Sequence, residues 1–414
     1  MNWTDIRQEE KNSIPVALCI VSGYFGYFMQ YMNITGQWAL SNFAFGIIIA
    51  FLSFAARIKG HKYSTKAKRT HLIFTVIITI VYMWSVLFKS SNYLILYYLF
   101  YVILPAYVIS GGFRVNIVLR TLCVVSIPTV LFYNSIFALS YIGLNQASMG
   151  ITYFVLDLAS AFILYIIYYR KEHRWYMTIA YVSSVILLIG IILHGVRGAI
   201  LSLVILLVIS YINKQSYNDE VHLLNDKRRT IRIGIIGLLS IVLLTNYAVI
   251  FEAIYELAYA VLPSVPGFIT KMVIYIRTGI ILNGRDSIIS GTFDVILKHP
   301  ILGVGVGNFG KFFVSTAGNN IVYPHNYLLQ FWAECGIIPA VIALMTTITA
   351  FKKLLFIRKE EKDNVVALIF FTSLIFPRFF VSLNIWSFTE IWMGLYCVIN
   401  LVANREQESE TINE

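Results

Sequence analysis

The chain has 414 residues, of which 58% are hydrophobic and only 13% are charged. Soluble globular domains carry charge on about 25% of their residues, so the composition excludes an ordinary soluble protein. The four cysteines lie far apart, in or beside apolar segments: Cys19, Cys123, Cys335 and Cys397. Their spacing matches no metal-binding motif, and we predict no disulfide framework.

Apolar segments recur along the whole length of the chain. An apolar helix of about 20 residues spans the hydrocarbon core of a bilayer, which is about 30 Å thick. We therefore predict an all-α integral membrane protein with about 12 transmembrane helices. The predicted spans are residues 14–33, 38–56, 71–88, 93–110, 115–133, 150–169, 175–193, 198–213, 233–250, 326–350, 364–383 and 386–403.

The distribution of basic residues predicts the orientation in the membrane. A net charge of +11 is also found in nucleic-acid-binding proteins. Here, however, 24 of the 32 lysines and arginines fall at the termini and in alternate loops, which face the cytoplasm if the N-terminus does. This is the positive-inside bias of membrane proteins. We therefore expect cytoplasmic N- and C-termini and no nucleic-acid partner.

This orientation divides the chain into four parts. The parts are nine spans in 1–250, an external loop at 251–325, three spans in 326–403 and a cytoplasmic tail at 404–414. The external loop is long but still apolar. Within it, apolar residues recur at helical spacing over 268–280 and 288–297, which predicts two amphipathic helices on the bilayer surface or over a cavity.

Arginines on the predicted external side have both a functional and a structural interpretation. Arg197 precedes Gly198, and a neighbouring glycine lets a substrate approach the backbone, although arginines at helix ends also simply reach the interface. Arg285 is the first residue of a predicted helix, where a positive charge is unfavourable to the helix dipole. The next residue, Asp286, supplies the negative charge that is favourable there. We take Arg197 and Arg285 as candidates for binding an anionic substrate, with Arg277 as a further candidate.

Three histidines also fall on the predicted external side. His325 opens the predicted span 326–350, where a histidine is often only an interfacial residue. It follows a glycine-rich turn, however, and histidine titrates near neutral pH, which suits proton transfer. His299 precedes Pro300 and is expected to fix the turn, and His194 is a spare candidate.

The run from Gly303 to Gly307 superficially resembles a nucleotide-binding loop. It lacks the preceding strand and the following Lys-Ser or Lys-Thr of a P-loop, and it faces away from cytoplasmic ATP. We interpret it as a tight loop that shapes a cavity wall.

Two ionisable residues fall inside predicted spans. Arg378 and Glu390 lie at similar depth in adjacent spans, and an unpaired charge there costs several kcal/mol. We predict a structural ion pair, with a substrate role as the alternative.

The motifs around these candidates resemble those of a known family. His-Pro-Ile-Leu-Gly-Val-Gly-Val-Gly-Asn-Phe at 299–309, followed by His325-Asn326, Leu329-Gln330 and Ala333-Glu334-Cys335-Gly336, is similar to the signature of the O-antigen polymerase and ligase family. Arg197-Gly198-Ala199 and Gly284-Arg285 resemble that family's two arginine motifs. The resemblance covers residues 190–340. Members of this family are polytopic glycosyltransferases of the GT-C type, which act at the outer face of the inner membrane on undecaprenyl-diphosphate-linked glycans.

The resemblance implies that an acceptor sugar hydroxyl attacks the anomeric carbon of the lipid-linked donor and expels undecaprenyl diphosphate. Guanidinium groups match the oxygens of a diphosphate, which assigns Arg197 and Arg285 to the leaving group. His325 is then the base for the acceptor hydroxyl. The predicted substrate contacts are Arg277, His194, His299, Asn326 and Asn308.

We predict that this chemistry needs no metal and no other cofactor. The external loop has no Asp-x-Asp motif, and its acidic residues are too dispersed for a magnesium site. The diphosphate bond supplies the driving force, so ATP is not required. The implied partners are the undecaprenyl-diphosphate-linked oligosaccharide, the lipid bilayer and a chain-length-regulating co-polymerase.

Three functions remain open. An O-antigen polymerase transfers the glycan to another lipid-linked repeat unit, and we favour it because the chain diverges outside the motifs. An O-antigen ligase shares the motifs but transfers the glycan to the lipid A core. A polysaccharide transporter or flippase is the third, although transporters often show inverted repeats and broken helices at the bilayer midplane.

Overall fold

The computed structural model describes most of the chain. The described residues are 8–31, 38–57, 65–89, 95–131, 147–171, 173–194, 197–214, 231, 234–235, 245–261, 265, 267–279, 285–313, 323–356, 362–375 and 384–412.

Every regular element in this part of the chain is a helix, as predicted. The α-helices are α1 (Gln8–Tyr31), α2 (Trp38–Arg57), α3 (Thr65–Phe88), α4 (Ile95–Tyr98), α5 (Leu104–Ile109), α6 (Val115–Val125), α8 (Ala147–Tyr168), α9 (Arg174–His194), α10 (Arg197–Lys214), α12 (Tyr247–Val261), α13 (Gly267–Thr278), α14 (Arg285–Lys298), α15 (Phe309–Phe312), α16 (Tyr327–Gln330), α17 (Ile337–Phe356), α18 (Lys362–Ile375) and α19 (Thr389–Ile412). Two π-helical turns, η2 (Leu99–Ile103) and η4 (Phe331–Cys335), and one 3-10 turn, η6 (Ile385–Ser387), complete the set.

Several of these helices are apolar enough to lie in a membrane. Three are also long enough to cross it: Arg69–Phe88, Arg174–Ile191 and Ile337–Leu354. Five shorter apolar helices accompany them: Phe43–Arg57, Ile95–Ile109, Val115–Val125, Thr152–Tyr168 and Gly198–Asn213. The chain is therefore a multi-pass membrane protein, although fewer described helices reach full spanning length than the predicted total of about 12.

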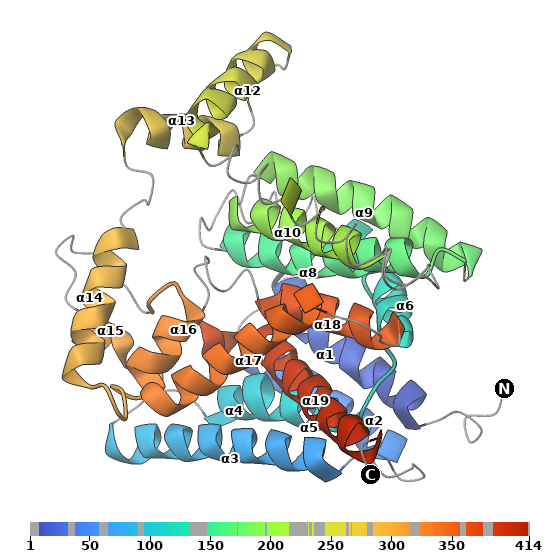
Figure 1. Ribbon diagram of the computed structural model, residues 1–414, viewed down its shortest axis with the longest axis vertical. Coiled ribbons are helices and arrows are strands. Elements are labelled where there is room, and N and C mark those ends of the chain that lie inside the picture. Colours follow the sequence, from blue (N-terminus) through green and yellow to red (C-terminus); the bar gives the residue numbers. More distant parts are fainter. Residues whose placement is uncertain are drawn as a thin grey trace.

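The centre of the bundle is formed by α18 and the first half of α19. Residues 365–372 of α18 and 389–400 of α19 are all buried, as expected for helices that are apolar on every side. α19 contacts α1, α3, α5, α17 and α18, while α3 and α9 lie at opposite edges of the bundle (Figure 1). The outward face of α3 leaves Leu72, Ile80 and Leu87 more than 60% exposed, which suits a surface covered by lipid.

Helices α12 to α14 lie outside this bundle. α12 and α13 pair with each other and project from the end near α9 (Figure 1). α13 and α14 coincide with the helices predicted over 268–280 and 288–297, whereas α12 is not among the predicted elements. α14 contacts η4, and it thereby joins the segment that leads into α17.

Two predicted spans are interrupted and one runs further than expected. The span predicted at 326–350 is broken into α16, η4 and α17, with Gly336 at the break. The span at 93–110 contains η2, because Pro105 has no amide hydrogen to donate and its ring crowds the preceding turn. α19 continues to Ile412, past the predicted end at 403. Most of the span predicted at 233–250 falls outside the described residues.

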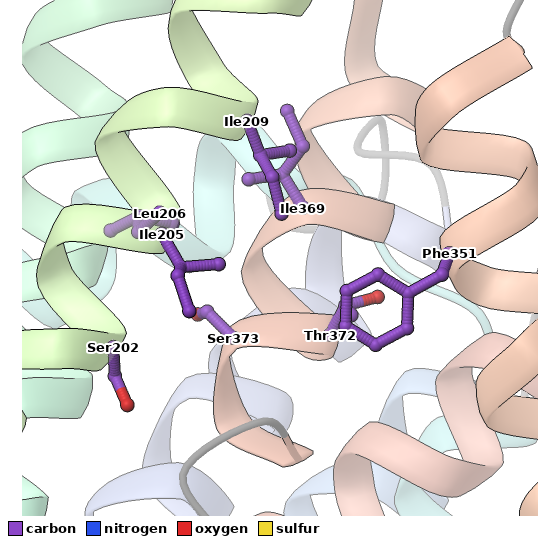
Figure 2. Close-up of a pocket in the computed structure, with 8 residues that line it drawn as sticks. All are labelled: Ser202, Ile205, Leu206, Ile209, Phe351, Ile369, Thr372 and Ser373. Atoms are coloured by element: carbon purple, nitrogen blue, oxygen red, sulfur yellow. The ribbon is translucent and has the colours of Figure 1, made fainter. Parts of the chain in front are cut away.

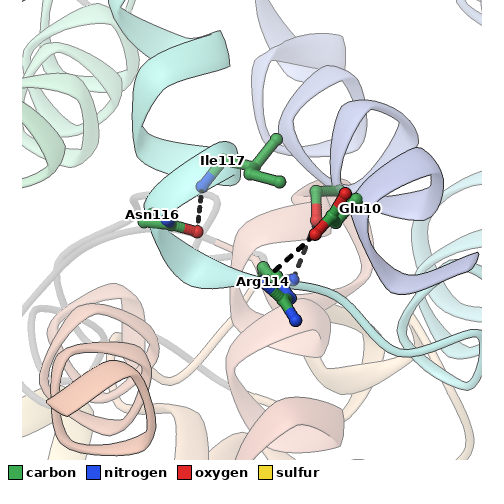
Figure 3. Close-up of polar contacts among 5 residues, drawn as sticks. Glu10, Arg114, Asn116 and Ile117 are labelled. Carbon is green, nitrogen blue, oxygen red and sulfur yellow. Dashed lines mark hydrogen bonds and ion pairs between the residues drawn. The ribbon is translucent and has the colours of Figure 1, made fainter. Parts of the chain in front are cut away.

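A buried polar contact fastens α1 to the loop between α5 and α6. The side chain of Asn12 donates to the carbonyl oxygens of Val108 (2.9 Å) and Gly112 (2.6 Å), and it accepts from Ser53 on α2 (2.7 Å). In the same region Glu10 forms an ion pair of 3.1 Å with Arg114, the residue before α6 (Figure 3).

Replacing Asn12 with alanine should lower the free energy of unfolding by about 2 kcal/mol, because two buried carbonyl groups would lose their donor. Thermal unfolding of the purified protein in detergent measures this loss. Thr178→Ala, which removes an exposed hydroxyl on α9, is the control and should leave the melting temperature unchanged. Equal stability of the Asn12 variant and the wild type would contradict the anchoring role.

Candidate functional site

His325 lies at the start of the segment that leads into α17, and its backbone is strained. Its φ of 60° makes it the one non-glycine residue with positive φ in the described chain. This conformation costs an ordinary residue about 1–2 kcal/mol. The half-buried imidazole packs edge-on against Tyr323, with 4.7 Å between ring centroids. Backbone strain at a residue able to transfer a proton points to a functional role.

Asn326 caps the helix that follows. Its side-chain oxygen accepts from the amides of Leu328 (3.0 Å) and Leu329 (3.1 Å), which are otherwise unpaired donors at the start of α16. The cap fixes the direction in which the chain leaves His325. A substrate contact by Asn326, as predicted, would therefore fall to its amide nitrogen.

The glycine turn at 303–307 is docked against η4 by backbone hydrogen bonds. The amide of Val304 donates to the carbonyl of Ala333 (2.8 Å), and the amide of Gly305 donates to that of Glu334 (2.9 Å). The other side of the turn meets the end of α3, where Val306 N donates to Ser85 Oγ (3.0 Å). The turn is thus held between two helical segments that are distant in sequence.

The remaining amides of the turn are also engaged within the protein. Gly303 donates to the carbonyl of His299 and Asn308 to that of Gly305, both at 3.1 Å. The amides of Gly307 and Phe309 face the Glu334 carboxyl. A phosphate-binding loop needs amides directed at its ligand. The turn is therefore the predicted tight loop, with these amides directed at protein groups instead of a phosphate. Its place in a cavity wall stays a prediction.

Two glycines are required where the turn meets η4. Gly303 has a φ of 65°, and a Cβ there would lie 2.5 Å from the backbone of Glu334. Gly336 has a φ of 84°, and its Cβ would overlap the carbonyl oxygen of Ile301. The glycines therefore allow two stretches of backbone to approach more closely than side chains permit.

Glu334 is a buried charged residue that the sequence analysis did not assign to the site. Its side chain is 0% exposed, and its Oε2 accepts from the indole of Trp386 (2.5 Å) and from Gln330 Nε2 (3.3 Å). It precedes the apolar span Ile337–Leu354. Burial raises the pKa of the Glu334 carboxyl to about 7, while Trp386, Gln330 and two backbone amides lower it. The signal in the sequence is an acidic residue two positions before Gly336, at the start of an apolar run.

Two other predicted site residues support the turn. The side chain of Asn308 is 1% exposed and donates to the carbonyls of Lys89 (2.8 Å) and Val304 (3.3 Å). The ring of His299 packs edge-on against Phe312, with 5.3 Å between centroids. Both side chains help to hold the turn in place, and their contact with substrate stays a prediction.

Arg197, Arg285 and His194 all lie at helix ends. Arg197 is the first residue of α10, Arg285 the first residue of α14 and His194 the last residue of α9. Their side chains lie outside the described part of the structure. α14 contacts η4 and α10 contacts α17, so the helices that begin at Arg197 and Arg285 each pack on part of the segment that follows His325.

Arg277 is engaged elsewhere. Its guanidinium forms a bidentate pair with Glu252 on α12, with distances of 2.9 and 2.7 Å, and lies 5.7 Å from the ring centre of Tyr255. α13 lies apart from α14 to α16 (Figure 1). The structure therefore does not bring Arg277 together with His325.

The predicted Arg378–Glu390 pair cannot be traced, because Arg378 lies outside the described residues. Glu390 itself is buried, at 1% exposure. Within the described part of the chain, no three His, Cys, Asp or Glu side chains gather as metal ligands would. Metal independence stays a prediction.

A small apolar cavity lies between α10, α17 and α18 (Figure 2). Its lining includes three hydroxyl residues, Ser202, Thr372 and Ser373. The Ser202 and Ser373 hydroxyls donate to carbonyls of their own helices, at 2.7 and 2.6 Å. The cavity therefore offers mainly apolar surface.

Comparison with known families identifies the segment that contains the glycine turn and His325. Residues 182–345 match the family model described as O-antigen ligase. The chain carries an O-antigen ligase family domain. No curated protein matches the sequence.

The O-antigen ligase family domain runs from within α9 into α17. It contains both arginine helix starts, the glycine turn, His325 and Glu334, while α1 to α8 and α18 to α19 lie outside it. The family implies glycosyl transfer of lipid-linked glycans. The site residues predicted from the resemblance all fall inside the matched segment.

Replacing Gly336 with alanine should destabilise the domain by about 3 kcal/mol, since the new Cβ would clash with the Ile301 carbonyl in a strained backbone. The folded fraction after detergent extraction, read by size-exclusion chromatography, and the melting temperature measure the effect. A Cβ at Gly234 meets no heavy atom within 4 Å, so Gly234→Ala is the matched control. A Gly336 variant as stable as this control would refute the tight docking of the turn.

Proposed function

We propose that this protein is an O-antigen polymerase that transfers a glycan from undecaprenyl diphosphate to an acceptor lipid-linked repeat unit. The observation that carries the proposal is the coincidence of an O-antigen ligase family domain with a strained, half-buried histidine at a helix start. The aliphatic- and aromatic-rich character of the chain outside its motifs is our ground for favouring a polymerase over a ligase.

In the proposed reaction, an acceptor sugar hydroxyl attacks the anomeric carbon of the donor. A new carbon–oxygen bond forms there as the bond to the diphosphate breaks. His325 accepts the hydroxyl proton, because imidazole titrates near neutral pH. Undecaprenyl diphosphate leaves as the anion.

Arg197 and Arg285 are the proposed binding residues for this leaving group. Both stand at the first position of an α-helix, where the unpaired amides and the helix dipole favour an anion. A guanidinium at such a place adds two parallel hydrogen bonds to diphosphate oxygens. His194 and Asn326 are proposed to contact the sugars, whereas Arg277 would first have to leave Glu252.

The proposed setting is the outer face of a bacterial inner membrane, with both termini cytoplasmic. The segment 251–325 would then lie outside, together with its helices α12 to α14. A GT-C-type arrangement, independence from metal and ATP, and a chain-length-regulating partner belong to the same proposal.

His325→Ala should lower the transfer rate by about 100- to 10,000-fold, because the proton of the acceptor hydroxyl would lose its base. Binding of undecaprenyl diphosphate should be unchanged, since the arginines remain. Transfer is measured with purified protein and lipid-linked repeat units, and binding by ligand-induced thermal shift.

His173→Ala, at an exposed histidine before α9, is the matched control and should transfer normally. A His325 variant that retains full transfer would remove the base from the proposal. A wild-type protein that moves lipid-linked glycans across the membrane without joining them would instead be a flippase.

The family description keeps an O-antigen ligase as the second candidate. A strain lacking the gene separates the two on a lipopolysaccharide gel. Loss of a polymerase should leave core bearing a single repeat unit, because repeats are still attached but not joined. Bare core with accumulated lipid-linked polymer would identify a ligase and contradict the proposal.

A further inference from the structure

The carboxyl group of Glu334 lies where two segments of the domain meet η6, which follows the domain in the chain. Trp386 reaches it from η6, Gln330 from α16, and the amides of Gly307 and Phe309 from the glycine turn. Trp386 and Gln330 both donate to the same carboxyl oxygen, Oε2, whereas the two amides lie near the carboxyl and lower its pKa. The Glu334 carboxyl is thus the acceptor that the Trp386 and Gln330 side chains share.

We propose that Glu334 is a positioning residue for the transfer reaction, whose carboxylate ties the glycine turn and η6 to the segment that carries His325. The inference rests on the proposed function and adds a residue that acts through others. Glu334 itself does not touch the reacting atoms.

The connection from Glu334 to His325 runs through Gln330. This side chain is 1% exposed, and its amide nitrogen donates to both Glu334 and Asn384 (2.8 Å). Its oxygen accepts from the amide of Ile385 (3.2 Å). The backbone amide of Gln330 donates to the carbonyl of Asn326 (2.9 Å). One helical turn therefore links the Glu334 cluster to the cap beside His325.

The ionised form of Glu334 suits this cluster best. A carboxylate only accepts, and its charge strengthens the hydrogen bonds that Oε2 accepts from Trp386 and Gln330. No titratable side chain contributes one of these donors; the adjacent Cys335 thiol has a pKa raised by burial and stays neutral. The active form is therefore expected above the Glu334 pKa of about 7.

Ionisation of Glu334 should reduce the free energy of unfolding of the protein. Burial raises the folded-state pKa of Glu334 from 4.5 to about 7, so the folded protein binds this proton more tightly than the unfolded chain does. Stability from this group is present at low pH and is lost as pH rises from 4.5 to about 7. Ionised Glu334 thus orders the site but lowers the free energy of unfolding.

The test compares the wild type with Glu334→Gln and with Trp386→Phe, all at full length in lipid nanodiscs. Transfer rates are measured with lipid-linked repeat units extracted from a strain lacking the gene, and melting temperatures are recorded across pH 5 to 9. Glu10→Gln, which removes a carboxylate from the ion pair with Arg114, is the matched control.

Glu334→Gln should lower kcat by about 100-fold with little change in KM, the size of effect that a misplaced catalytic group produces. Trp386→Phe should lower kcat in the same sense by a smaller factor. In the wild type, kcat plotted against pH should fall on the acid side (the acid limb) with a slope steeper than that of a single protonation. The reason is that His325 and Glu334 must both be deprotonated. The limb should become first-order in Glu334→Gln, and Glu10→Gln should behave as the wild type.

A wild-type acid limb of first order, or an unchanged kcat in folded Glu334→Gln, would overturn the inference. So would a melting-temperature difference between wild type and Glu334→Gln that does not vary with pH, and this readout needs no transfer activity. Absence of transfer in the wild type, by contrast, would count against the proposed function. If Glu334→Gln does not fold, two other results test the inference. They are the order of the acid limb in the wild-type kcat profile and the value of kcat in Trp386→Phe.

Discussion

Two backbone hydrogen bonds, from Val304 to Ala333 and from Gly305 to Glu334, hold the glycine turn against η4. A third runs from the amide of Ile337 to the carbonyl of Pro300 (3.1 Å). Together they join α14 to α17 across the break in the helix at Gly336. These direct backbone contacts help to hold the segment between His325 and α17 in shape, and glycine at 303 and 336 permits them.

A membrane environment makes such pairing obligatory. Backbone amides and carbonyls that face no water must find partners inside the protein, so irregular backbone is tolerated only where protein surrounds it. The turn, η4 and η6 satisfy this condition with side chains as well as backbone: Ser85, Asn308 and Glu334 serve the turn, and Gln330 serves η6. Asn12 does the same for the loop after α5. The break in α16–η4–α17 is therefore a built feature of the domain.

The sequence predicted the helical class and the importance of the stretch from His299 to His325, because hydropathy and the glycine spacing are local signals. It did not predict that the span at 326–350 is broken. Residues 326–335 carry Asn326, Gln330 and Glu334 but lead directly into the apolar stretch from Ile337, so the sequence predicts a single span there. The interruption depends on Gly336 meeting Ile301, a contact distant in sequence. Glu334 lies in one of the family-like motifs, but its role could not be predicted for a similar reason, since Trp386 and the turn at 307–309 are distant from it in sequence. The pairing of Arg277 with Glu252 likewise depends on how α12 folds back on α13.

The internal use of the glycine turn constrains how a diphosphate could be held. In a P-loop the backbone amides donate to the phosphate, whereas here they donate to carbonyl oxygens and a serine hydroxyl, and two lie near the Glu334 carboxyl. A second anion at the turn would be repelled by that carboxylate. In the proposed reaction the leaving group would then be neutralised by cations away from the turn, and Arg197 and Arg285, each the first residue of an α-helix, are the proposed ones. The turn and the arginines would serve separate tasks in that proposal, because the Glu334 carboxyl already lies against the turn.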